Sequence, residues 1–113
     1  MPLTLFQHQQ AFLRQVPLLL RALWDAGFDV TAGELLRTQE QQDIYLRTGR
    51  TKATFSNHQQ KLAIDLNVFR NGKFATKADM QAIGDYWESL DSLNRWGGNF
   101  KSIVDCPHFE RNI

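Results

Sequence analysis

The sequence predicts a small α+β domain in which flanking helices cover a small antiparallel sheet. Three observations lead to this class. Apolar residues recur at helical spacing near the N-terminus, the segment 62–69 alternates apolar and polar residues, and Asn71-Gly72 marks a hairpin directly after it. With 113 residues, of which 42% are hydrophobic, the chain can bury one ordinary core, so we expect a single domain over residues 1–113.

The first element is predicted to be an amphipathic helix from about Thr4 to Ala26. Thr4 and Gln7 have the spacing of a capping box. Pro17 lies inside this helix and is expected to kink or divide it, and Gly27 is expected to end it. Its apolar face comprises Phe12, Val16, Leu19, Leu20 and Leu23.

The next elements are a strand at 28–36, weakened by Gly33, and a second helix. Thr38 and Gln41 predict that the helix is capped, and Gly49 is expected to end it. A polar loop at 49–57 leads to the alternating strand, whose apolar face comprises Leu62, Ile64, Leu66 and Val68.

The return strand of the hairpin is predicted to begin at Lys73. Thr76 and Asp79 then cap a third helix, and the tail from Trp96 onward is predicted to be loop and short strand. Trp24 and Trp87 are both expected in the core.

Composition excludes several classes of function. Thirteen Lys and Arg against twelve Asp and Glu give a formal charge of +1, so the chain lacks the excess of basic residues that is typical of nucleic-acid-binding proteins. The single cysteine excludes an internal disulfide. The apolar run 16–20 is too short for stable membrane insertion, and residues 7–10 are polar where a signal peptide would be apolar. We therefore expect a protein that is made in a cytoplasm, and we expect it to be a monomer.

The residues that carry chemistry are His58, Asp65 and His108. Asp65 faces away from the apolar side of its strand, where it can point into a cleft. Two imidazoles and a carboxylate suit Zn²⁺ and leave a fourth position for water, whose pKa the metal lowers. From spacing alone, the alternative that both histidines are structural stays open. His8 lies among glutamines and is expected to be solvated.

A hydrolytic site also needs a proton acceptor beside the water. Asp105 lies three residues before His108, across a tight Cys-Pro turn, and Glu110 is the rival because it shares the face of His108 on a strand. A nucleophilic role for Cys106 lacks a separate His/Asn pair, so a small buried thiol is expected there.

Two separated segments resemble the D-alanyl-D-alanine carboxypeptidase family of zinc peptidases, which shares its fold with Hedgehog domains. Ser56-Asn57-His58 with Ala63-Ile64-Asp65-Leu66 resembles the family's SxH…AxDL signature. The run 96–100, Trp-Gly-Gly-Asn-Phe, and the run 105–110, Asp-Cys-Pro-His-Phe-Glu, resemble its closing motif. Arg37-Thr38, Gln41 and Gly49-Arg50-Thr51 resemble an upstream segment, so the likeness covers about residues 27–110.

The resemblance implies a role for each matching residue. His58, Asp65 and His108 become the zinc ligands, and Asp105 becomes the base that activates water. Substrate-binding roles fall to Arg37, which would grip a carboxylate, and to Ser56 and Gln41. Lys61 departs from the pattern, because the family commonly has glycine there. If that position needs a positive φ, Lys61 either alters the turn or bends outward, and we favour the second.

An aspartate in the position of the base is similar to phage L-alanyl-D-glutamate endopeptidases, the endolysins that cut peptidoglycan stem peptides. The resemblance thus implies a phage or prophage endolysin that reaches the wall through a holin-like partner. Two alternatives remain open. One is a D-Ala-D-Ala carboxypeptidase or dipeptidase on the same site. The other is a metal-bearing domain that binds a peptide or protein without turnover, against which the presence of Asp105 argues.

Overall fold

A computed structural model describes residues 2–51 and 55–113, so part of the predicted loop at 49–57 lies outside the described residues. The helices are α1 (Leu5–Asp25), α2 (Gln39–Arg47) and α3 (Lys77–Ser89), with short 3₁₀ helices η1 (Asn57–Gln60) and η2 (Gly97–Asn99). The strands are β1 (Asp29–Ala32), β2 (Ala63–Arg70), β3 (Lys73–Phe74), β4 (Asn94–Trp96) and β5 (His108–Arg111).

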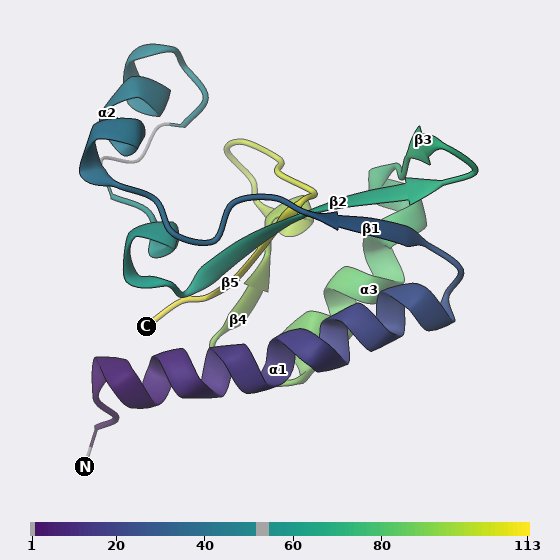
Figure 1. Ribbon diagram of the computed structural model, residues 1–113, viewed down its shortest axis with the longest axis horizontal. Coiled ribbons are helices and arrows are strands. Elements are labelled where there is room, and N and C mark those ends of the chain that lie inside the picture. Colours follow the sequence, from purple (N-terminus) through teal and green to yellow (C-terminus); the bar gives the residue numbers. More distant parts are fainter. Residues whose placement is uncertain (1, 52–54) are drawn as a thin grey trace.

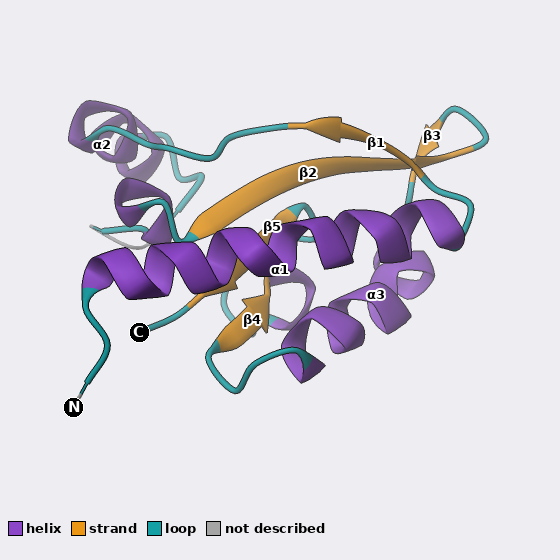
Figure 2. Cartoon of the chain, turned by 60° about the horizontal axis from the view of Figure 1, so that its bottom comes forward, coloured by secondary structure: helices purple, strands orange, loops and turns teal. Residues whose placement is uncertain are grey.

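The strands form one antiparallel sheet in the order β1-β2-β5-β4, and β3 pairs with the end of β2. Helices α1 and α3 lie together on one face of this sheet, and α2 stands apart beyond one end of β2 (Figures 1 and 2). The predicted α+β class is confirmed. The face that α1 and α3 leave uncovered is where the polar side of β2 points.

Helix α1 begins as predicted, because Thr4 and Gln7 form the reciprocal capping box. Of the two outcomes predicted for Pro17, a kink or a division, the division is wrong, because α1 continues through it. Pro17 and Leu13, whose carbonyl loses its N–H partner, are both exposed, so water can satisfy that carbonyl. Gly27 ends the helix with a φ of +86°.

The strands differ from prediction at two points. β1 ends at Ala32 rather than 36, because the regular pairing with β2 is broken there: Gly33 N–H still donates to Asp65 O, but Asp65 N–H donates to Glu34 O, so two residues oppose Asp65. β4 was not predicted, since three residues are too few to show a period. The hairpin is confirmed, with positive φ at both Asn71 and Gly72.

The core lies between the two helices and the sheet, and aromatic rings dominate its centre. Trp87 is buried as predicted and packs edge-on against Phe12 and Phe109. Trp24 is 55% exposed, so its predicted core position is wrong, because it lies off the buried face of α1. The prediction of a solvated His8 is also wrong: its Nδ1 accepts a hydrogen bond from Arg111 Nε at 3.0 Å.

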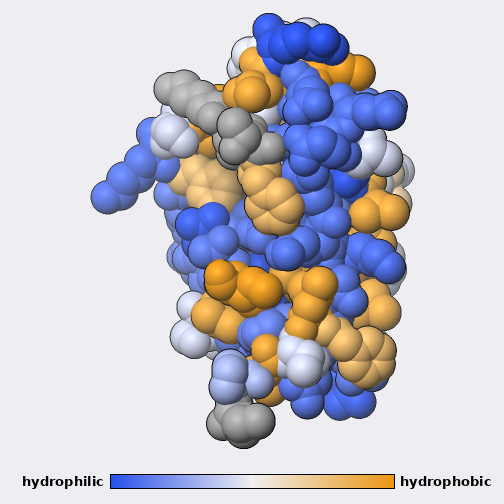
Figure 3. Space-filling model, turned by 90° about the vertical axis from the view of Figure 1, so that its left-hand side faces the viewer, coloured by the Kyte–Doolittle hydropathy of each residue, from blue (hydrophilic) through white to orange (hydrophobic). Residues whose placement is uncertain are grey.

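Figure 3 views the end of the molecule that carries α2, where hydrophilic side chains cover much of the surface and hydrophobic ones gather around the start of α1. Leu3, Leu5 and Phe6 are exposed there. None of the described helices combines the length and the apolar character that crossing a membrane requires.

Candidate active site

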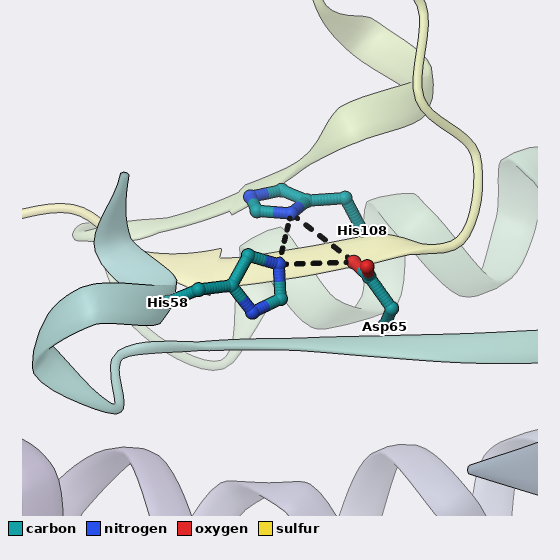
Figure 4. Close-up of side chains that lie close together, drawn as sticks. All are labelled: His58, Asp65 and His108. Carbon is teal, nitrogen blue, oxygen red and sulfur yellow. Dashed lines mark hydrogen bonds and ion pairs between the residues drawn. The ribbon is translucent and has the colours of Figure 1, made fainter. Parts of the chain in front are cut away.

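Three elements bring His58, Asp65 and His108 together on the uncovered face of the sheet. His58 lies on η1, Asp65 on β2 and His108 on β5, and the last two are directly paired across the antiparallel strands. The three side chains point toward one another (Figure 4). The structure therefore brings the three predicted ligand residues together.

The ligand atoms form a small triangle. His58 Nε2 lies 3.1 Å from Asp65 Oδ1 and 3.1 Å from His108 Nδ1, and His108 Nδ1 lies 3.3 Å from Asp65 Oδ1. A tetrahedral zinc with bonds of about 2.0–2.1 Å holds its ligand atoms roughly 3.3 Å apart. The spacing therefore fits a tetrahedral metal ion with three protein ligands.

The other ring nitrogens of both histidines are held by acceptors. His58 Nδ1 donates to Leu35 O at 3.0 Å, and His108 Nε2 donates to Glu110 Oε1 at 2.7 Å. When the rings are neutral, the nitrogens that face Asp65 therefore carry lone pairs. Three electron-pair donors around one point require a positive species between them, which is either a proton or a metal ion.

A proton on His108 is one way to supply that positive charge. Burial lowers the pKa of His108, but its hydrogen bonds to Asp65 and Glu110 outweigh burial and raise the pKa to about 9. Burial raises the pKa of Asp65, yet the hydrogen bonds from both histidines hold it well below its usual range. The site is thus built to bind positive charge.

Asp105 lines the same cleft as Asp65 and His108. Its carbonyl accepts the His108 N–H at 3.1 Å, and its own N–H donates to Gly97 O at 2.9 Å, so the turn is held at both sides. A Cβ on Gly97 would lie 2.1 Å from Asp105 O, which explains why glycine stands there. Burial raises the pKa of the Asp105 carboxyl, a shift toward better proton acceptance.

Glu110, the rival of Asp105, is already engaged. One carboxylate oxygen accepts from His108 Nε2, and the other lies 2.7 Å from Arg95 Nε and 2.6 Å from Arg95 Nη2. This carboxylate orients a histidine and is itself anchored by an arginine. The geometry favours Asp105 as the proton acceptor.

Two of the three predicted substrate-binding residues line the cleft. Arg37 and Ser56 line the cleft, but Gln41 is not among the described lining residues. The neighbouring Gln42, which sequence reasoning missed, is buried and accepts from Arg37 Nη1 at 2.8 Å. Its full burial on an otherwise polar helix left no signal in the sequence.

Ser56, Lys61 and Cys106 lie close in the sequence to the candidate ligands. Ser56 Oγ caps η1 and accepts from the His58 N–H at 3.3 Å. Lys61 has a φ of 57°, so the position does need a left-handed backbone, and its exposed side chain leaves the turn intact. The prediction of a buried thiol at Cys106 is wrong, because the residue is only half-buried; this partial burial raises the pKa of its thiol.

Comparison with known proteins identifies the family. The structure is similar to that of the L-Ala D-Glu endopeptidase ChiX of Serratia marcescens, with a TM-score of 0.67 and 19% sequence identity over 94% of this chain and 84% of that one. No curated protein matches the sequence. Residues 49–111 match the sequence profile of the D-alanyl-D-alanine carboxypeptidases. Because that profile spans more than half of the 113 residues and both metal motifs, the chain belongs to the D-alanyl-D-alanine carboxypeptidase family of peptidases.

Proposed function

We propose that this chain is a zinc-dependent peptidase that hydrolyses the L-alanyl–D-glutamate bond of peptidoglycan stem peptides. The observation that carries the proposal is the triangle of His58 Nε2, Asp65 Oδ1 and His108 Nδ1, which opens into a cleft that Asp105 also lines. The choice of bond is supported by the aspartate at position 105 and by the fold shared with an endopeptidase of that specificity.

The roles of the residues follow from their contacts. When bound, zinc supplies a Lewis acid that lowers the pKa of a coordinated water and polarises a carbonyl. Asp105 accepts the proton of the attacking water and later delivers it to the leaving amine. Leu35 O and Glu110 keep His58 and His108 in the tautomers that present lone pairs.

Digestion of purified peptidoglycan, with mass spectrometry of the products, tests the bond that is cut. New N-terminal D-glutamate is expected, lost with chelator and restored by zinc. Release of terminal D-alanine would instead support the carboxypeptidase, the activity that the family is named for. No products from zinc-loaded protein would refute the peptidase and leave a binding domain.

Zinc content tests the ligand set separately from catalysis. We expect about one Zn²⁺ per chain, lost in a His58→Ala/His108→Ala variant. His8→Ala is the matched control, because His8 lies away from the triangle and contacts Arg111. Full zinc binding by the double variant would contradict the site.

The biological setting is part of the proposal. We place the protein in a phage or prophage, made in the host cytoplasm and acting as a monomer on the wall after release through a holin-like partner. Expression in a bacterium with and without a co-expressed holin tests this. Lysis only in the presence of the holin is expected, and equal lysis without it would refute the release route.

A further inference from the structure

Two arginines line the wall of the cleft that α2 builds. Arg37 Cζ lies 4.7 Å from the centroid of the Tyr45 ring, and Arg50 Cζ lies 4.6 Å from the same centroid. All three residues line the cleft. The Arg50 N–H also donates to Tyr45 O at 2.9 Å, so backbone and ring together fix this arginine beside α2.

The two guanidinium groups differ in what they bind inside the protein. Arg37 forms an ion pair with Glu34 through Nε and donates to Gln42 through Nη1, and its side chain is only 11% exposed. Arg50 is exposed, and no carboxylate within residues 2–51 and 55–113 forms an ion pair with it. Arg50 therefore keeps its planar set of donors available on the cleft wall.

We propose that Arg50, supported by Tyr45, binds a substrate carboxylate at a distance from the scissile bond. A guanidinium that stacks on an aromatic ring and presents free donors is suited to bidentate recognition of a carboxylate. This inference rests on the proposed function and specifies which stem peptides the cleft prefers.

The position of Arg50 selects among the carboxylates of a stem peptide. Glu34 Oε1 lies 3.9 Å from His58 Nδ1 and pairs with Arg37, so Arg37 stands near the metal ligands. Arg50 contacts the same Tyr45 ring, but within the described residues it forms no hydrogen bond or ion pair with Glu34 or with the three proposed ligands. The α-carboxylate of D-glutamate is adjacent to the scissile nitrogen and belongs near Arg37. The next carboxylate along the stem is on the side chain of the third residue, where meso-diaminopimelate has one and lysine has none.

The test compares two tripeptide amides, L-Ala-γ-D-Glu-meso-diaminopimelate and L-Ala-γ-D-Glu-L-Lys, which differ by that side-chain carboxylate. We expect the native protein to prefer the diaminopimelate peptide about ten- to a hundredfold in kcat/KM, the range for a hydrogen-bonded charge. Arg50→Gln is expected to lower the ratio of the two kcat/KM values to about one, because it slows cleavage of the diaminopimelate peptide and leaves that of the lysine peptide unchanged. Arg50→Lys keeps the positive charge but lacks the paired donors of the guanidinium, so its preference ratio is expected to lie between those of the native protein and Arg50→Gln.

Arg47→Gln is the matched control, because Arg47 is an exposed arginine at the end of α2 that does not line the cleft. It is expected to keep the full preference. An Arg50→Gln variant with unchanged preference, or with equal losses on both peptides, would overturn the inference, as would equal cleavage of both peptides by the native protein. Cleavage of neither peptide by zinc-loaded native protein would refute the proposed function itself.

Discussion

The metal-free protein is expected to lose stability between about pH 6.5 and pH 9. His108 Nδ1 lies 3.3 Å from Asp65, and its Nε2 lies 2.7 Å from Glu110. Burial opposes these contacts, but they raise the pKa of His108 from 6.5 to about 9. The folded chain therefore keeps a proton that the unfolded chain releases, and the stabilisation is complete below pH 6.5 and lost as the pH rises through about 9.

The size of the effect follows from that difference in pKa. The difference is about 2.5, and each tenfold change in proton affinity corresponds to about 1.4 kcal/mol, so roughly 3 kcal/mol of unfolding free energy is at stake. Bound zinc replaces the proton and removes this loss. Because zinc competes with that proton, its apparent affinity is expected to rise about tenfold per pH unit up to about pH 9.

Urea unfolding of chelator-treated protein at several pH values measures the loss. His108→Asn serves as the reference for all other titrating groups, and its stability is expected to change much less across the same range. Glu110→Gln removes one of the two anions beside the ring, so its loss of stability is expected to be smaller and to end at a lower pH than that of the native chain. A metal-free stability that stays constant or rises from pH 6.5 to 9 would refute the reasoning.

Further predictions concern substitutions at four single residues. Asp105→Asn is expected to keep its zinc and its fold but to lower turnover on peptidoglycan by a factor of about 10²–10⁴. Glu110→Gln is instead expected to weaken zinc binding about 10- to 100-fold, measured by competition with a chelator. Lys61→Gly is expected to stabilise the protein by about 0.5–1 kcal/mol in urea unfolding, because glycine adopts the left-handed conformation without strain, whereas Lys61→Ala should change little. Gly97→Ala is expected to destabilise by about 1–3 kcal/mol, since its methyl group would collide with the backbone of Asp105, and normal stability and activity would contradict this contact.

The local patterns of the sequence predicted the elements well. The capping residues Thr4 and Thr76, the alternation in β2 and the Asn71-Gly72 turn are each determined by neighbours within four residues, and each is present. The proximity of His58, Asp65 and His108 was also predictable, but through the resemblance of their two motifs to a peptidase family, because spacing alone left a structural role for both histidines open.

What could not be predicted depends on contacts between distant parts of the chain. The exposure of Trp24 depends on where α3 and the sheet meet α1, and the bond from Arg111 to His8 joins residues near the two termini. Gln42 carries no local sign that it is buried against Arg37. Such positions are decided by tertiary packing, which a helical or alternating pattern does not encode.

The segment that forms the α2 wall of the cleft begins and ends at neighbouring positions beside the sheet. Arg37 N–H donates to His58 O at 3.1 Å, so the two ends of the stretch between Arg37 and His58, which contains α2, are held side by side. Changes of length or sequence within this stretch are therefore expected to preserve the strand register and the triangle. Evolution can thus exchange this stretch as a unit, and grafting it from one relative onto another is a direct route to transferring peptide preference while the hydrolytic machinery stays in place.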